Sequence, residues 1–407
     1  MTSWQPILYG ADAELAWQSI DDIARVLRAT AETRPDVGTG LAGIAVFFHY
    51  LARARGDADA ARVGAELLDR ALAIASESRD LSLHHGLAGV AWAAEHVAAA
   101  TDADDPHDEL DDVFASTLDS YWDDYDLADG VIGVGVYALA RARRPAALEL
   151  ARRVIDDLES KLEPVGGGHA WVTRARPGIE PLKPGHAAWC DLGMASGCAG
   201  AIAFLAAAHR CSELCASARR VLDVVMPWFL ARCQPGIGYD QAWADGAALA
   251  GSRLAWCYGN VGVGTALLHA GRAAENAAWE AAGRELLLLD VDAKSTSGQH
   301  HVINITVCHG AVGLAHLYSR IFNITAIPAF ASAARRWAMD GLSRRYPGEP
   351  LARYPSWALG PSLVDGRSAD ESLLTGIAGI GLVLLGCVTS IAPDWDEILL
   401  TRPLPSK

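Results

Sequence analysis

The chain has 407 residues, of which 51% are hydrophobic and 20% are charged, the composition of an ordered globular protein with a large core. It carries 34 Lys and Arg against 49 Asp and Glu, so its formal net charge is -15. This balance argues against a nucleic-acid binder, because phosphate recognition relies on clustered basic side chains.

The N-terminal residues 1–27 contain scattered acidic side chains and no basic stretch before an apolar core, so they lack the pattern of a secretory signal. The most apolar run, residues 376–392, is interrupted by Thr389 and Ser390 and is too short for a spanning helix. We therefore expect a cytoplasmic protein without a membrane span. Its 8 cysteines are expected to be thiols or metal ligands rather than disulfides.

A Gly-x-x-Gly motif followed by apolar residues recurs along the whole chain. The glycine pairs are Gly40 and Gly43, Gly86 and Gly89, Gly130 and Gly133, Gly197 and Gly200, Gly259 and Gly262, Gly310 and Gly313, and Gly376 and Gly379. Each pair opens a stripe of apolar residues at helical spacing. The intervals have room for this helix, a turn and a second helix, such as residues 60–76 or 145–162. The repeating unit is therefore predicted to be a helical hairpin.

The two recurring glycines need a cause, because glycine costs about 1 kcal/mol relative to alanine inside a helix. We expect the missing side chains to let neighbouring backbones approach closely in crowded inner helices. Seven hairpins can form an open solenoid or a closed ring. The uneven intervals and the lack of polar capping repeats favour closure. The predicted fold is all-α, a closed double ring of seven inner and seven outer helices in one domain spanning residues 1–407.

Two stretches rich in Pro and Gly depart from the helical pattern. Residues 163–187 lie between the third and fourth motifs, and residues 345–367 lie between the sixth and seventh. Both are predicted to be loop insertions. They are either ordered loops that border a binding site or disordered surface insertions.

The residues just before each first glycine are richer in Cys, His, Asp and hydroxyl groups than the helices that follow. In chain order the pairs are Gly38-Thr39, His84-His85, Ala128-Asp129, Ala195-Ser196, Cys257-Tyr258, Cys308-His309 and Leu374-Thr375. If the inner helices run in the same direction, these pairs gather at one end of the ring. Cys257 and Cys308 then occupy equivalent places in consecutive repeats and should be neighbours.

Two thiolates and one imidazole, from Cys257, Cys308 and His309, would make a tetrahedral zinc site with one open position. Sulfur ligands favour zinc over magnesium, calcium or manganese. The alternative is a pair of small buried cysteines beside a hydrogen-bonded histidine at the start of a helix. The equivalence of the two cysteines within the repeat favours the metal site.

The chain resembles the LanC family of lanthipeptide cyclases, including its stand-alone members. Besides the seven motifs, the likeness lies in three runs: Tyr125-Asp126-Leu127-Ala128-Asp129-Gly130, Ser252-Arg253-Leu254-Ala255-Trp256-Cys257-Tyr258-Gly259 and Cys308-His309-Gly310. The resemblance implies an α/α toroid, one zinc ion held by Cys257, Cys308 and His309, and a site lined by Asp126, Arg253 and Tyr258.

The same resemblance implies an enzyme of antibiotic biosynthesis that closes thioether rings. A cysteine thiol of a ribosomally made precursor peptide would add to a dehydroalanine or dehydrobutyrine of the same peptide, giving lanthionine or methyllanthionine. The implied partners are the dehydrated precursor peptide, a lanthipeptide dehydratase and a transporter. Through such a complex the protein would be peripheral to the membrane.

Three residues have roles that the chemistry suggests. Arg253 is permanently charged and suits stabilisation of the enolate formed by thiol addition. Asp126 would orient a neighbour or relay a proton, or it would only stabilise the start of a helix. Family members usually carry a histidine where this chain has Ser196, and a hydroxyl does not exchange protons at neutral pH as imidazole does.

The loss of that histidine leaves several explanations open. Another group or water takes over proton transfer, or the cyclase activity is lost or altered. The histidines whose positions make them candidates are His84, His85 and His186. Other functions also remain open: addition of an external thiol such as glutathione, or a non-catalytic scaffold that binds the precursor peptide and its dehydratase. A glycosidase of the related α/α-barrel type would need paired carboxylates instead.

Overall fold

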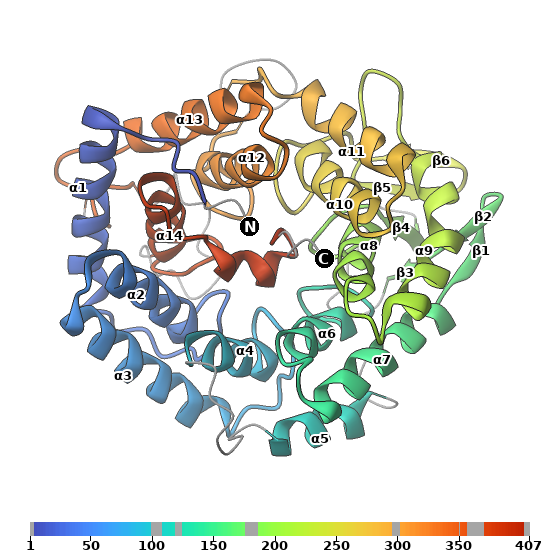
Figure 1. The fold of residues 1–407 in the computed structure, drawn as a ribbon, viewed down its shortest axis with the longest axis horizontal. Helices are drawn as coiled ribbons and strands as arrows, with labels where there is room; N and C mark the ends of the chain where they lie inside the picture. Colours follow the sequence, from blue (N-terminus) through green and yellow to red (C-terminus); the bar gives the residue numbers. More distant parts are fainter. Residues whose placement is uncertain are drawn as a thin grey trace. The chain divides into compact units, whose positions relative to one another are not determined.

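The computed structural model describes residues 4–98, 108–118, 124–175, 186–294, 302–349, 351–355 and 370–402. These residues are mainly helical (Figure 1). Their contacts divide the chain into two compact units. Unit 1 comprises residues 1–99, 291–396 and 405–407, and unit 2 comprises residues 100–290 and 397–404.

One helix begins directly after the first glycine of each motif, and we call these seven the glycine-capped helices. They are α2 (Leu41–Arg55), α4 (Leu87–Val97), α6 (Val131–Ala140), α8 (Cys198–His209), α10 (Asn260–Ala273), α12 (Ala311–Thr325) and α14 (Ile377–Val388). The first glycine is the N-cap residue in every case. Side chains on all sides of α8 and α14 are buried, as expected for helices enclosed by others.

The remaining α-helices pack against glycine-capped helices, except α5, which packs mainly against α7. They are α1 (Gly10–Leu27), α3 (Ala58–Ala75), α5 (Asp108–Thr117), α7 (Pro145–Ser160), α9 (Cys215–Leu230), α11 (Ala277–Leu289) and α13 (Pro328–Ser343). Their starts follow local rules: the Asp57 carboxylate caps α3, and proline opens α7 and α13. The second helices predicted at residues 60–76 and 145–162 are thus observed as α3 and α7.

The last glycine-capped helix, α14, takes its partner from the other end of the chain. In the described residues up to 402 it is followed by a short 3-10 helix, η2 (Asp394–Leu399), whereas α1 packs beside it within unit 1. The segment before α1 is anchored to the end of α14, because the backbone N–H groups of Ile7 and Leu8 both donate to Cys387 O at 3.0 Å. The Trp4 indole donates to Gly386 O at 2.7 Å. The first helix of the sequence therefore completes the last hairpin.

Within each unit, the glycine-capped helices lie side by side in the order of the repeats. In unit 1 the order is α12, α14, α2, α4, and in unit 2 it is α6, α8, α10. Figure 1 shows the partner helices α13, α1 and α3 of unit 1 running beside α12, α14 and α2. The chain order of the motifs is thus also their spatial order inside each unit.

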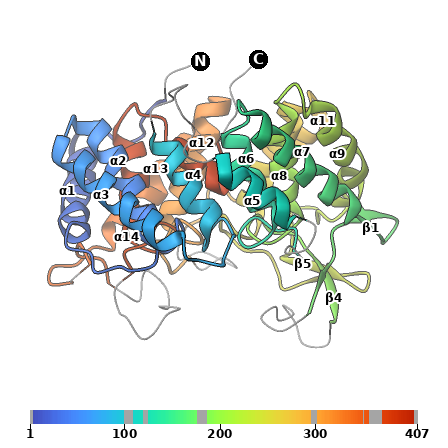
Figure 2. The ribbon, with the colours of Figure 1, turned by 90° about the horizontal axis from the view of Figure 1, so that it is seen from below.

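Unit 2 also contains short β-strands between its helices. They are β1 (Glu163–Val165), β2 (Gly168–Ala170), β3 (Thr173–Arg174), β4 (Ala188–Asp191), β5 (Ala242–Ala244) and β6 (Ala247–Leu249). All pairs are antiparallel; β1 and β2 form a hairpin, and the other four form a sheet in the order β3-β4-β5-β6. Figure 2 shows β4 and β5 beyond the ends of the unit 2 helices.

The first strands fall in a stretch predicted to be loop. The reason is the turn between β1 and β2, where Gly166 and Gly167 have φ of 52° and 86° and form the two-residue connection that twisted hairpins favour. Residues 176–185 of the predicted insertion lie outside the described residues. In the second predicted insertion, Leu351 and Tyr354 form an isolated bridge, and residues 350 and 356–367 lie outside the described part.

The motif glycines are explained by the segments that precede them. We call the six residues before each first glycine a lead-in loop. A Cβ atom on Gly310 would lie 2.1 Å from Thr306 N, and one on Gly313 would lie 2.0 Å from Val307 O, both in the same lead-in loop. The neighbouring repeat also packs against the second glycine of a motif. A Cβ atom on Gly379 would lie 2.7 Å from the side chain of Val307, which belongs to the preceding repeat. The sequence predicts that the motif glycines let neighbouring helix backbones approach each other. In the structure, the backbone that approaches these glycines most closely is that of the lead-in loop.

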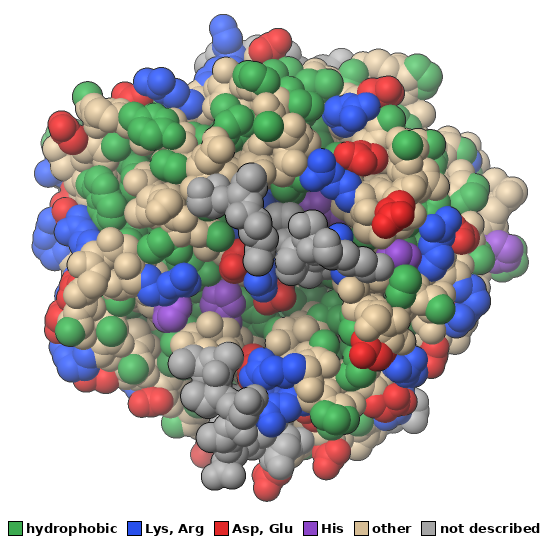
Figure 3. Space-filling model, in the orientation of Figure 1, with side chains coloured by type: hydrophobic (Ala, Val, Ile, Leu, Met, Phe, Trp, Pro, Cys, Tyr) green, Lys and Arg blue, Asp and Glu red, His purple; other side chains and the backbone are tan. Residues whose placement is uncertain are grey.

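The surface carries both signs of charge. Figure 3 shows basic, acidic and apolar side chains interspersed over the face turned to the viewer. Exposed ion pairs such as Arg62 with Glu66 and Arg219 with Asp223 lie along single helices. Among the described helices, none combines the length and the apolar character needed to cross a membrane.

Candidate metal centre and its surroundings

Backbone hydrogen bonds join the lead-in loops of neighbouring repeats in unit 1. They link the residues that stand two positions before each first glycine. Cys308 N donates to Leu374 O at 3.0 Å, and Leu374 N donates to Gly38 O at 3.0 Å. Gly38 N then donates to His84 O at 2.9 Å. The four loops of unit 1 are thus tied together at equivalent positions.

Unit 2 repeats the same arrangement. Ala128 N donates to Ala195 O at 3.2 Å, which joins the third and fourth lead-in loops. Met194 N, one residue before Ala195, donates to Cys257 O at 2.8 Å and joins the fourth to the fifth. Within each unit, the residues before the first glycines therefore gather at one end of the glycine-capped helices, as the sequence predicts.

Cys308 and His309 lie immediately before the N-cap of α12 and are half-buried. The Thr306 hydroxyl accepts a hydrogen bond from His309 N at 3.3 Å and shapes the turn. The N-terminus of a helix carries a partial positive charge, which favours the thiolate form of a nearby cysteine. Their local setting therefore suits a metal ligand.

Cys257 occupies the equivalent place before α10 and is buried, with 7% of its surface exposed. A bridge between Leu254 and Gly259 closes its lead-in loop. Gly259 has a φ of 97°, and a Cβ atom there would lie 1.6 Å from Arg253 O. Only glycine fits this position, and the tight turn that it permits fixes the backbone that carries Cys257.

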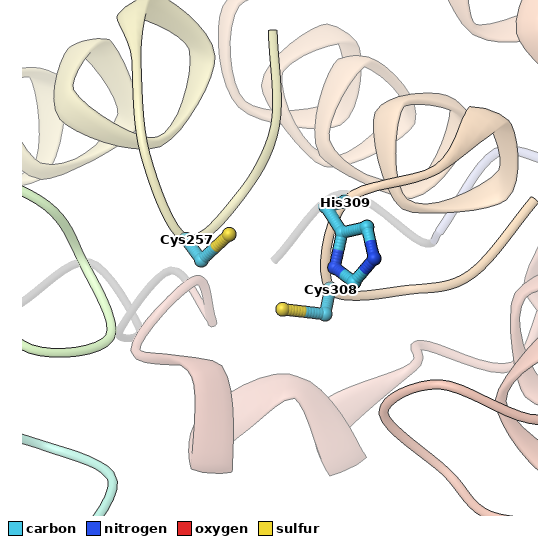
Figure 4. Close-up of side chains that lie close together, drawn as sticks. All are labelled: Cys257, Cys308 and His309. Carbon is cyan, nitrogen blue, oxygen red and sulfur yellow. The ribbon is translucent and has the colours of Figure 1, made fainter. Parts of the chain in front are cut away.

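Cys257, Cys308 and His309 form a candidate metal-binding group. One ligand atom from each lies within 4.8 Å of the others, and no other group of three or more His, Cys, Asp or Glu in the described part of the chain shares this property (Figure 4). Two sulfurs and an imidazole nitrogen form a donor set that zinc prefers. Three protein ligands would leave a tetrahedral ion one position for an exogenous group.

Tyr258 and Ser196 are brought together, whereas Arg253 stands at the surface. Tyr258 is half-buried, and its hydroxyl lies near the side chain of Ser196, which belongs to the lead-in loop of α8. Burial, reinforced by the charge of Asp191, raises the pKa of the Tyr258 phenol, so it stays protonated at neutral pH. The exposed Arg253 side chain is available to a ligand that reaches this loop.

Asp191, which the sequence analysis does not single out, is the buried acidic partner of this pair. It ends β4 and is only 4% exposed. One carboxylate oxygen, Oδ1, accepts a hydrogen bond from Gly193 N at 2.8 Å, and Oδ2 accepts one from the Tyr258 hydroxyl at 2.7 Å. Burial raises the pKa of Asp191 to about 6, so the carboxylate is still mainly ionised at pH 7.

A signal for Asp191 does exist in the sequence. An aspartate stands six residues before the first glycine in four of the repeats: Asp80, Asp124, Asp191 and Asp370. Three of them accept a hydrogen bond from the backbone N–H two residues later, namely from Ser82, Gly193 and Ser372. The recurrence identifies a turn-forming role. The additional contact with Tyr258 depends on tertiary structure.

Asp126 is buried in the lead-in loop of α6, where its Oδ1 accepts hydrogen bonds from Asp129 N at 2.8 Å and Gly130 N at 3.2 Å. Burial raises the pKa of Asp126 to about 7, and the charges of Asp129 and Asp124 add to the effect. Its loop joins that of Ser196 through the bonds to Ala195. The role that its contacts support is stabilisation of the start of α6.

The three candidate histidines are in different environments. His84 is buried, and its carbonyl accepts the bond from Gly38 N that joins two lead-in loops. His85 is exposed and interacts electrostatically with Asp36. His186 pairs through Nδ1 with Asp245 at 3.0 Å.

Solved structures of known proteins match this chain along most of its length. The structure of "Nisin cyclase" matches with a TM-score of 0.69 at 17% sequence identity, covering 94% of this chain and 97% of that one. An inactive variant of alpha-1,6-mannanase from Salegentibacter sp. HEL1_6, solved with alpha-1,6-mannotetrose, matches with a TM-score of 0.47 at 12% identity, covering 92% of this chain and 98% of that one. No curated protein matches the chain.

The match to nisin cyclase shows the fold, and the predicted all-α, α/α-toroid class is confirmed. The family described as "Lanthionine synthetase C-like protein" matches residues 31–400, which include all seven glycine motifs and each of the candidate ligands. The chain therefore belongs to the lanthionine synthetase C-like family.

Proposed function

We propose that the chain is a zinc-dependent cyclase that forms lanthionine and methyllanthionine rings in a dehydrated, ribosomally made peptide. The observation that carries this proposal is the group of two cysteines and one histidine, Cys257, Cys308 and His309, in a chain of the LanC-like family. The fold shared with nisin cyclase is consistent with it.

The residues fit one zinc ion by their chemistry. Both cysteines stand at helix N-termini, where the thiolate form is favoured, and the third donor is an imidazole. When bound, zinc would lower the pKa of a coordinated substrate thiol and so supply a nucleophile at neutral pH. Cys198, at the start of α8, and Cys387, in the body of α14, are by contrast buried thiols whose pKa is raised by burial.

The reaction is an addition that needs no redox partner. The sulfur of a substrate cysteine forms a bond to the β-carbon of dehydroalanine or dehydrobutyrine, and the C=C π bond breaks. The electron pair moves onto the α-carbon and its carbonyl as an enolate. The thiol loses one proton and the α-carbon gains one, so substrate and product are isomers.

Different residues around the candidate ligands would stabilise the enolate, line the site and support protonation of the α-carbon. The exposed guanidinium of Arg253 would stabilise the enolate, because it keeps its charge at any working pH. The Tyr258 side chain, adjacent in sequence to Cys257, would line the site that receives the peptide. Ser196 does not act as an acid or base by itself, so we assign protonation of the α-carbon to water that reaches the half-buried Ser196.

Ring closure is tested with a dehydrated peptide that contains one free cysteine. Mass spectrometry after alkylation with iodoacetamide counts the remaining thiols, because a closed ring resists alkylation. We expect the wild type to remove the thiol and Cys308→Ala to close rings at least about 100-fold more slowly. Cys233→Ala, which alters an exposed cysteine outside the lead-in loops, should match the wild type. Equal rates for Cys308→Ala and the wild type would contradict the proposal.

The same assay separates the other functions. Binding of the peptide without loss of its thiol would identify a scaffold, the alternative that Ser196 favours. A mass gain of one glutathione per dehydrated residue would identify addition of an external thiol. The dehydratase and transporter partners, the cytoplasmic location and the single-domain organisation remain predictions.

A further inference from the structure

The fourth lead-in loop packs directly against Cys257 and Tyr258. A Cβ atom on Gly193 would lie 2.5 Å from Cys257 O and 2.7 Å from two carbons of the Tyr258 ring. The next residue, Met194, donates its N–H to Cys257 O at 2.8 Å. The placement of the segment that carries Cys257 therefore depends on the conformation of residues 191–197.

Asp191 stabilises that conformation through two hydrogen bonds to its carboxylate. Its Oδ1 accepts from Gly193 N, which fixes the turn that brings Gly193 and Met194 against Cys257. Its Oδ2 accepts from the Tyr258 hydroxyl at 2.7 Å. One buried carboxylate thus holds both the packing loop and the tyrosine that follows the candidate ligand.

The same contacts set the direction of the hydrogen bonds. An ionised carboxylate only accepts, so the single hydroxyl proton of Tyr258 is committed to Asp191. The phenol oxygen of Tyr258 then faces the nearby Ser196 hydroxyl only as an acceptor. The Ser196 hydroxyl stands beside the hydrogen-bonded pair of Tyr258 and Asp191, and its oxygen can accept from a substrate or water.

We propose that Asp191 is a positioning residue of the cyclase site: it holds the Cys257–Tyr258 segment in place and makes Tyr258 a hydrogen-bond acceptor toward Ser196. This inference rests on the proposed function. It assigns Ser196 a defined part in place of the family's histidine, namely to accept a hydrogen bond from an incoming N–H, O–H or S–H group.

A double-mutant cycle tests the coupling. Asp191→Asn can satisfy either Gly193 N or the Tyr258 hydroxyl with its one carbonyl oxygen, but not both, so we expect kcat for ring closure to fall about tenfold with zinc content unchanged. In a Tyr258→Phe background, Asp191→Asn should change kcat by less than about twofold, because the shared bond is already absent. An equal loss in both backgrounds would reduce Asp191 to a structural residue and overturn the proposal.

The matched control is Tyr137→Phe. Tyr137 also donates a buried hydrogen bond to a carboxylate, that of Asp111 at 2.8 Å, but it lies in the body of α6. This variant loses the same kind of bond and should keep wild-type kcat within about twofold. A tenfold loss here would show that kcat follows general destabilisation, which would also overturn the proposal.

A second readout does not depend on catalysis. In the full chain stripped of metal by a chelator, iodoacetamide labelling of Cys257 and Cys308 is followed by peptide mass spectrometry. We expect Asp191→Asn to speed labelling of Cys257 several-fold and to leave Cys308 unchanged, because only Cys257 is held by the loop that Asp191 fixes. Equal acceleration at both cysteines, or none, would overturn the proposal. If the wild type closes no rings yet Cys257 responds alone, the positioning role stands and the proposed cyclase function fails.

Discussion

At the scale of single residues, several polar side chains that suggest catalysis are bonded chiefly to the backbone. Asp126 stands four residues before a first glycine and accepts the N–H of the residue just before that glycine. Side chains at the same place in other repeats do likewise: Asp36, Thr306 and Ser372. A carboxylate and a hydroxyl are interchangeable in this turn, so the contact needs no negative charge.

Asp126→Asn should therefore keep the turn and remove a pH-dependent cost. The pKa of Asp126 in the folded chain is raised from 3.8 to about 7, so its contribution to stability is full below pH 3.8 and is lost as the pH rises through 7. We expect the free energy of unfolding of the variant to increase, relative to that of the wild type, by roughly 2–3 kcal/mol between pH 5 and pH 8. Urea unfolding at both pH values measures this. A difference that does not change with pH would refute it.

At the scale of elements, the lead-in loop and its glycine-capped helix form one unit, and the second glycine is its tightest point. In α14, a Cβ atom on Gly379 would lie 1.9 Å from Leu373 O. In the same helix, a Cβ atom on Gly386 would meet nothing closer than 3.6 Å. Two glycines with the same helical backbone thus differ only in the space around them.

Alanine substitution separates these two cases. Gly379→Ala should destabilise the chain by about 2–4 kcal/mol, because the lead-in loop or the helix must shift. Gly386→Ala should be neutral or stabilising by up to about 1 kcal/mol, because alanine favours the helix and fills open space. Urea midpoints of both variants decide the matter. Similar losses for the two would mean that helix propensity or other effects, not the lead-in loop, explain the motif.

The elements also show which features were accessible from sequence. All seven glycine-capped helices begin where the motifs predict, because capping and apolar periodicity are local properties. The pairing of α1 with α14 was missed, since it joins opposite ends of the chain. The β1–β2 hairpin is not predicted, because Gly166 and Gly167 are as typical of a loop as of a tight turn. The contact of Asp191 is not predictable either, because its partner Tyr258 is 67 positions away.

At the scale of the whole molecule, one rule of repetition accounts for both the architecture and the candidate ligands. Within the units, backbone hydrogen bonds at or next to the residue two before a first glycine join consecutive lead-in loops, from that of Cys308 to that of His84 and from that of Ala128 to that of Cys257. Cys257 and Cys308 stand at this position in the fifth and sixth repeats. A pattern that serves packing in most repeats is therefore expected to serve metal binding where it carries cysteine.

The zinc content of the purified chain tests this central claim most directly. Elemental analysis should find one zinc ion per wild-type chain and per Cys387→Ala control, and less than about one tenth of that in Cys257→Ala and Cys308→Ala, because loss of one thiolate from a three-ligand site leaves too few donors. Wild-type protein without zinc, or cysteine variants that retain a full equivalent, would contradict the account.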